Sequence, residues 1–203
     1  MKKIALIHRV ILLAVMLLFF SSSAYSEEFK AWVFSKLPSV PEGICVDSKG
    51  TLYVSLFHEC QIGRLDNDGK YEPIAYVPSE NYKNKGMLMG MVTDKEDNIY
   101  ACFVEKSKYE ELEGKSHPAR FDVNVTKTGI YKINPKTAEV SAVATRGDGY
   151  PFCFPDDIDM DSAGNIYFTD FTFPAIFKIT NDGKVVIWAE PDEFRWTKSS
   201  DLP

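Results

Sequence analysis

The sequence has no basic stripe, no Cys-x-x-Cys pair and no low-complexity tract. Acidic residues outnumber basic residues by 29 to 23, which gives a formal net charge of −6. The lack of clustered positive charge argues against nucleic-acid binding. The lack of closely spaced cysteine pairs argues against a structural zinc site. The hydrophobic content of 45% and the charged content of 26% are typical of one globular domain.

Long hydrophobic runs are also absent, apart from one of 11 residues at 10–20. This run is too short for a comfortable membrane span. It follows a basic start and precedes Ala24 and Ser26, which have the spacing of a cleavage site. We therefore predict a signal peptide at 1–26 and an exported mature domain at 27–203. That domain is periplasmic or secreted and has no membrane contact after cleavage; an uncleaved anchor is the alternative.

The mature chain would be strongly acidic. Without residues 1–26 it has 20 basic and 29 acidic residues, a charge of about −9 by simple count. Such a surface suits cation binding where carboxylates converge. An exported protein can keep disulfides, and four cysteines allow three pairings that sequence does not distinguish. Buried thiols are the alternative for all four: Cys45, Cys60, Cys102 and Cys153.

A unit of four short apolar-alternating runs, joined by turn residues, occurs three times, at about 40–78, 86–145 and 153–190. The units align at an aspartate in the first turn, where we expect the carboxylate to bond backbone amides. They also align at a tyrosine six residues later, which we expect to pack in the core. Repeated four-stranded units predict an all-β fold, a β-propeller with about three blades present. A β-sandwich is the alternative, but it does not explain the repetition.

A stretch at 30–38 is similar to the fourth run of each unit, so we expect it to be a closing strand of the ring. Propellers have roughly 4–8 blades, which makes this chain a partial propeller. We expect it to be a fragment; the alternative is that two copies associate into one ring. Either way, the end blades are expected to expose apolar faces.

Candidate site residues lie at the predicted channel mouth, five residues before each aligned aspartate. They are Glu42, Met89 and Asp156, and Asp157 follows directly. Carboxylates that converge from several loops suit Ca²⁺, which takes about 6–8 oxygen ligands. The alternative is that these acidic residues only bond backbone amides.

A 21-residue insertion within residues 105–128 falls on the same face and suggests a lid, or else a surface excursion without a role. It contains His117, which is either solvated or catalytic. Both readings stay open at this point.

Three motifs carry a resemblance to a known family: Pro-Glu-Gly-Ile at 41–44, the Asp-x-x-Gly-x-Ile/Leu-Tyr hairpins, and the stretch at 156–171. Together they resemble the senescence-marker-protein/gluconolactonase/luciferin-regenerating-enzyme family, close to its bacterial lactonases. The resemblance implies the N-terminal half of a six-bladed propeller. It implies Glu42 and Asp156 as ligands of Ca²⁺ or another divalent cation, and Asp157 as a proton-handling or ligand-orienting group. Asp156 departs from the family's more frequent asparagine.

The function implied by this resemblance is calcium-dependent hydrolysis of a small-molecule lactone or related ester. Two alternatives remain. One is a non-catalytic binding propeller similar to NHL-repeat proteins, and the other is an inactive relic of a truncated gene.

Overall fold

The structure is a computed structural model that describes residues 30–78, 83, 85–106, 109–112, 115–118, 127–147, 150–171 and 175–189. The chain divides into two compact units, Met1–Val33 and Phe34–Pro203, and every strand that the structure describes lies in the second. The predicted signal peptide falls outside the described residues. In the part of the chain that the structure describes, no helix has the length and apolarity needed to span a bilayer.

Three four-stranded antiparallel sheets make up the fold, and we call them blades one, two and three. Blade one contains β1 (Pro41–Val46), β2 (Leu52–Leu56), β3 (Gln61–Leu65) and β4 (Tyr71–Tyr76). Blade two contains β5 (Gly86–Thr93), β6 (Ile99–Glu105), β9 (Gly129–Asn134) and β10 (Glu139–Ala144). Blade three contains β13 (Pro155–Met160), β14 (Ile166–Asp170), β15 (Ala175–Ile179) and β16 (Val185–Ala189). The prediction of an all-β fold with about three blades is confirmed for the described residues.

The first turn of each blade is built by its aligned aspartate. Asp47 Oδ1 accepts hydrogen bonds from the amides of Lys49 and Thr51, at 2.9 and 2.8 Å. Asp94 and Asp161 accept the equivalent amide bonds in blades two and three. The carboxylate thus accepts the hydrogen bonds of turn amides that have no partner in the strand ladder, as the sequence predicted.

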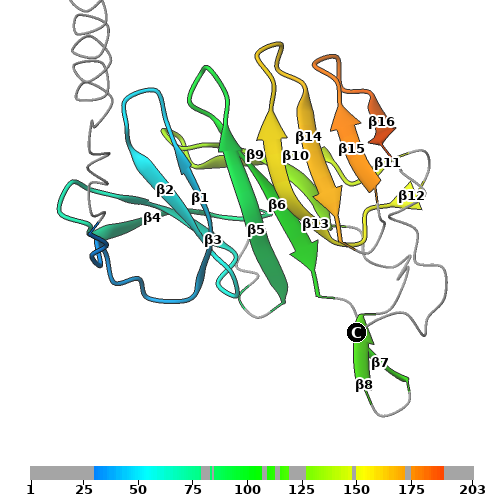
Figure 1. The fold of residues 1–203 in the computed structure, drawn as a ribbon, viewed down its shortest axis with the longest axis horizontal. Coiled ribbons are helices and arrows are strands. Elements are labelled where there is room, and N and C mark those ends of the chain that lie inside the picture. Colours follow the sequence, from blue (N-terminus) through cyan, green and yellow to red (C-terminus); the bar gives the residue numbers. More distant parts are fainter. Residues whose placement is uncertain are drawn as a thin grey trace, which may run out of the picture. The chain divides into compact units, whose positions relative to one another are not determined.

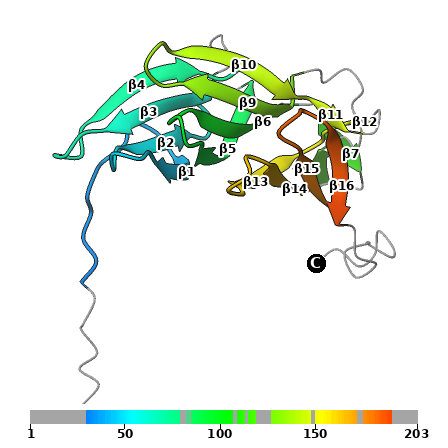
Figure 2. The same cartoon turned by 90° about the horizontal axis from the view of Figure 1, so that it is seen from above.

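Blade two lies between the other two blades. Its first strand β5 contacts both β1 and β13 (Figure 1). In Figure 2 the four strands of each sheet can be traced side by side, from the first strand to the fourth. The first strands β1, β5 and β13 are therefore the three strands that come together, and the predicted site lies on them.

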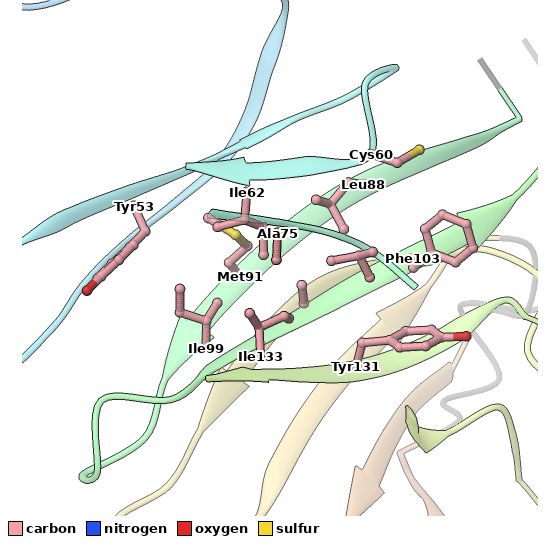
Figure 3. Close-up of a cluster of buried hydrophobic side chains, with 12 residues drawn as sticks. Tyr53, Cys60, Ile62, Ala75, Leu88, Met91, Ile99, Phe103, Tyr131 and Ile133 are labelled. Carbon is pink, nitrogen blue, oxygen red and sulfur yellow. The ribbon is translucent and has the colours of Figure 1, made fainter. Parts of the chain in front are cut away.

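The core consists of apolar layers between neighbouring blades. One cluster fills the space between blades one and two (Figure 3) and includes Ile62, Leu88, Ile99 and Phe103, all fully buried. A second cluster joins blades two and three around Phe152, Phe168 and Phe177, whose rings pack at centroid distances of 4.9–5.3 Å. Apolar side chains stay exposed in blades one and three: Ile44, Val46, Ile187 and Trp188.

Two small sheets were not predicted. A hairpin of β7 (Tyr109–Leu112) and β8 (Lys115–Pro118) lies within the insertion, and β11 (Arg146–Gly147) pairs with β12 (Tyr150–Pro151) between blades two and three. Conversely, the described chain has no strand between Lys30 and Val40. A closing strand needs the last blade as its partner, so the closing role of 30–38 stays a prediction.

Cys45, Cys60, Cys102 and Cys153 are thiols in this structure, which agrees with the alternative of buried thiols. Cys60 and Cys102 are fully buried, while the other two are half-buried. The Sγ of Cys60 donates to the carbonyl oxygen of Phe57 at 3.9 Å. Cys60 and Cys102 therefore pack as small apolar residues of the core.

Candidate functional site

The first strand of each blade carries a β-bulge at the same position. Its register against the second strand shifts between Pro41 and Ile44 in β1, between Leu88 and Met91 in β5, and between Pro155 and Ile158 in β13. In each blade, two first-strand residues therefore face one second-strand residue. A bulge of this type bends the strand and redirects its side chains, and it is frequent beside active sites.

The bulges contain every predicted site residue. They consist of Glu42 and Gly43 in blade one, Met89 and Gly90 in blade two, and Asp156 and Asp157 in blade three. The side chains of Glu42 and Asp157 are exposed and Asp156 is half-buried. Met89 is only 6% exposed and packs in the second core cluster, so blade two contributes an apolar side chain rather than a carboxylate.

Two glycines allow the three bulges to touch. A Cβ atom on Gly90 would lie 2.6 Å from Asp157 Oδ1 and 3.0 Å from the carbonyl oxygen of Asp156. A Cβ atom on Gly43 would lie 2.7 Å from the carbonyl oxygen of Met89. Real Cβ atoms do not approach other atoms this closely, so larger residues would push the bulges apart.

The carboxyl groups of Glu42, Asp156 and Asp157 interact electrostatically, and we call them the carboxylate cluster. Partial burial raises the pKa of Glu42, and the charges of Asp156 and Asp157 raise it further. Burial also raises the pKa of Asp156, followed by the charges of Asp157 and Asp170. The charges of blade three thus oppose the ionisation of Glu42 in blade one. The structure brings all three predicted residues into one group.

Asp170 is a fourth carboxylate at the site, and sequence reasoning missed it. It is 4% exposed, and its oxygens accept hydrogen bonds from the amides of Cys153 and Phe154 at 2.9–3.1 Å. Asp170 therefore holds the segment that enters β13 just before Asp156. The available signal was an acidic residue at the end of an otherwise apolar strand, β14.

The described residues contain no group of three or more His, Cys, Asp or Glu side chains arranged to hold a metal ion. The cluster does supply hard carboxylate oxygens, the donors that Ca²⁺ prefers, and a cation would relieve their mutual repulsion. Since Ca²⁺ takes about 6–8 ligands, the cluster fits part of a calcium site. Completing that site requires donors beyond this cluster.

The insertion connects β6 to β9 of blade two, and polar contacts hold its two ends together. Thr128 is 1% exposed, and its Oγ1 accepts a hydrogen bond from the amide of Glu105 at 2.9 Å. Glu105 Oε2 accepts one from the amide of Lys127 at 3.1 Å. These bonds join the two ends of the insertion. His117 belongs to β8, and its side chain lies outside the described residues.

Comparison with known proteins places the fold. No protein-family model matches the sequence. A segment of 70 residues is 34% identical to STRICTOSIDINE SYNTHASE-LIKE 3 of Arabidopsis thaliana, over 31% of this chain and 18% of that protein. A solved gluconolactonase from Xanthomonas campestris has a TM-score of 0.54 at 15% identity, over 76% of this chain and 48% of that one.

A second solved structure is similar to the same extent. It is a catalytically inactive virginiamycin B lyase from Staphylococcus aureus with quinupristin, with a TM-score of 0.52 at 17% identity. The match covers 75% of this chain and 43% of that one. The chain thus spans less than half the length of these structures. The predicted resemblance to gluconolactonase-type propellers is confirmed at the level of the fold.

Proposed function

We propose that this chain forms part of a lactonase-type propeller that hydrolyses lactones or related esters with the help of a bound calcium ion. The observation that supports this most directly is the carboxylate cluster, which two blades build on first-strand bulges. Repelling carboxylates at the meeting point of the blades cost stability unless a cation or a proton joins them. A bound cation would remove this cost, which supports a metal-binding use of the cluster.

The residues have separate parts in this proposal. Glu42 and Asp156 would hold Ca²⁺, which supplies Lewis-acid polarisation of the substrate carbonyl when bound. Asp157 Oδ1 accepts a hydrogen bond from the amide of Ile158 at 2.9 Å, which orients its carboxylate. Asp157 would take the proton released as water adds to the carbonyl carbon. It would return that proton to the leaving oxygen as the ester C–O bond breaks.

The metal part of the proposal is tested by calcium binding to the purified chain. We expect binding in a calorimetric titration and a rise in Tm with added Ca²⁺. Glu42→Gln removes one charged ligand and should weaken binding by more than about tenfold. Glu139→Gln, at an exposed position of β10, is the matched control and should bind as the wild type does. A wild-type chain that neither binds Ca²⁺ nor gains stability would overturn the metal assignment.

The hydrolytic part is tested by acid release from small lactones at constant pH, with and without EDTA. Acid release that EDTA abolishes supports a calcium-dependent hydrolase, whereas acid release that persists in EDTA contradicts it. Calcium binding without any acid release would favour the alternative of a non-catalytic binding propeller. That alternative is favoured by one observation: no three His, Cys, Asp or Glu side chains among the described residues are arranged to hold a metal ion.

A further inference from the structure

One second-strand residue faces each bulge, and these three residues correspond to one another in the repeat. They are Ser55 in β2, Cys102 in β6 and Thr169 in β14. Each follows the aligned tyrosine of its blade by two residues. The blades that carry carboxylates have a hydroxyl at this position, and the blade with Met89 and Gly90 has a thiol.

Ser55 joins the bulges of blades one and two through a single oxygen. Its side chain is fully buried. Its Oγ accepts a hydrogen bond from the amide of Gly43 at 2.7 Å and donates to the carbonyl oxygen of Met89 at 3.0 Å. A hydroxyl can do both at once because it has one donor and two acceptor sites. The backbone next to Glu42 is therefore tied to the neighbouring blade.

Thr169 makes the corresponding contact in blade three. Its Oγ1 accepts a hydrogen bond from the amide of Asp157 at 3.2 Å. A bulge interrupts the regular ladder, so a side-chain acceptor at this point replaces a lost ladder bond and fixes the bend. The same interaction thus supports the backbone on both sides of the carboxylate cluster.

Cys102 faces the bulge of blade two, which holds no carboxylate. Its side chain is fully buried. A thiol is a weak hydrogen-bonding group, so blade two lacks the hydroxyl that faces the bulge in each of the other two blades.

We propose that Ser55 and Thr169 are positioning residues, whose hydroxyls fix the bulges so that Glu42, Asp156 and Asp157 face a common point. This inference rests on the proposed function in taking that point to be the calcium site. It differs from a purely structural role in one respect. Loss of a structural bond would lower Tm alone, whereas loss of a positioning bond would also weaken calcium binding.

The test compares hydroxyl-removing and matched variants for their Kd for Ca²⁺ and their Tm. Ser55→Ala and Thr169→Val should bind Ca²⁺ about tenfold more weakly, as is typical for supporting partners of metal ligands. Thr169→Ser keeps the hydroxyl and should bind as the wild type does. Ser55→Cys fills the same volume with a poor hydrogen-bonding group and should bind as weakly as Ser55→Ala. Unchanged Kd values in Ser55→Cys and Thr169→Val would overturn the inference, even with a lowered Tm.

A second readout separates this inference from the proposed function. If the wild-type chain binds no Ca²⁺, the metal assignment fails, and amide hydrogen exchange measured by NMR decides the inference instead. The amide of Gly43 in Ser55→Ala, and that of Asp157 in Thr169→Val, lose their acceptors and should exchange faster than in the wild type. Unchanged exchange rates would overturn positioning. If Ser55→Ala does not fold, the Thr169 pair decides, since that side chain is exposed.

Discussion

Gly90 is the residue on which the geometry of the site depends most. Blade two separates the carboxylates of blades one and three, and only a residue without a side chain lets its bulge touch Asp156 and Asp157. Gly90 is not one of the glycines with a positive φ angle. Glycine is therefore required here because of the available space, not because of the backbone conformation. A larger residue at this position would act directly on the cluster.

Gly90→Ala should therefore harm calcium binding as well as stability. The added methyl group has to move Asp157 or the backbone of Asp156, and overpacking of this kind costs about 1–3 kcal/mol of unfolding free energy. We expect at least about a tenfold rise in the Kd for Ca²⁺, as in other changes beside metal ligands, measured by calorimetry together with Tm.

Gly147→Ala is the matched control for this variant. Its Cβ atom would lie 2.9 Å from Val185 Cγ1 and 3.2 Å from a ring carbon of Phe152. It should cost a similar stability through apolar crowding while leaving the Kd for Ca²⁺ unchanged. Equal Kd values in Gly90→Ala and Gly147→Ala would contradict the role given to Gly90.

At this scale the sequence predicted the acidic residues but not their supports. Glu42, Asp156 and Asp157 stand out because charge at the start of an apolar strand is unusual. Ser55 and Thr169 do not stand out, since serine and threonine are ordinary strand residues. Their alignment with Cys102 two residues after each tyrosine was visible in the sequence, but its meaning depends on a bulge that side-chain alternation does not reveal.

Among elements, the first hairpin of each blade depends on its turn aspartate. Asp94 accepts hydrogen bonds from the amides of Glu96 and Asn98 at 3.0 and 2.8 Å, and it pairs with Lys132 Nζ at 3.4 Å. Hydrogen bonds from the Asn98 side chain and from the turn amides, together with the charge of Lys132, hold the pKa of Asp94 below its ordinary value despite partial burial. The turn therefore also anchors the third strand of the blade, β9.

Asp94→Ala should destabilise the chain by about 2 kcal/mol, because it leaves two turn amides without their acceptor. Asp94→Asn keeps an acceptor for the amides and loses the ion pair with Lys132 and the Oδ2 acceptor of the Asn98 side chain, so its loss should be smaller. Urea denaturation of the three proteins measures the difference. An Asn variant as unstable as the Ala variant would show that these Oδ2 contacts, not the turn amides, dominate.

The strands themselves were largely predictable. Alternating apolar residues and Gly/Asn/Asp turns predicted three units of four runs each, and the twelve strands of the blades fall within these units. The hairpin β7–β8 was missed because the insertion is polar and lacks alternation. The pair β11–β12 was missed because two-residue strands such as Arg146–Gly147 carry no period.

For the whole molecule, the carboxylate cluster predicts how stability changes with pH in the absence of metal. The pKa values of Glu42 and Asp156 are raised from ordinary values of 4.5 and 3.8. A raised pKa means that the folded state binds protons more tightly than the unfolded state. The resulting stability is present below the ordinary values and is lost as the pH rises through the raised ones.

Glu42→Gln should thus gain Tm relative to the wild type as the pH rises above 4.5, since the variant has no charge to repel Asp156. Melting curves in EDTA at low ionic strength, from about pH 3 to pH 8, measure this difference, and added salt should reduce it. Asp47, Asp94 and Asp161 have lowered pKa values. Their loss of stability below 3.8 is common to both proteins and cancels. A wild type that gains on the variant with rising pH would contradict the prediction.

The contact of the three bulges has a consequence for how such a site can change. Glu42 and Asp156 belong to different blades, so the separation of their backbones is set by the thickness of blade two and not by any rotamer. Replacing Glu42 or Asp156 itself by another donor changes the ligand but leaves this backbone separation intact. In the proposed calcium site, the middle blade would therefore set the spacing of the donors, and its neighbours would set their chemical type.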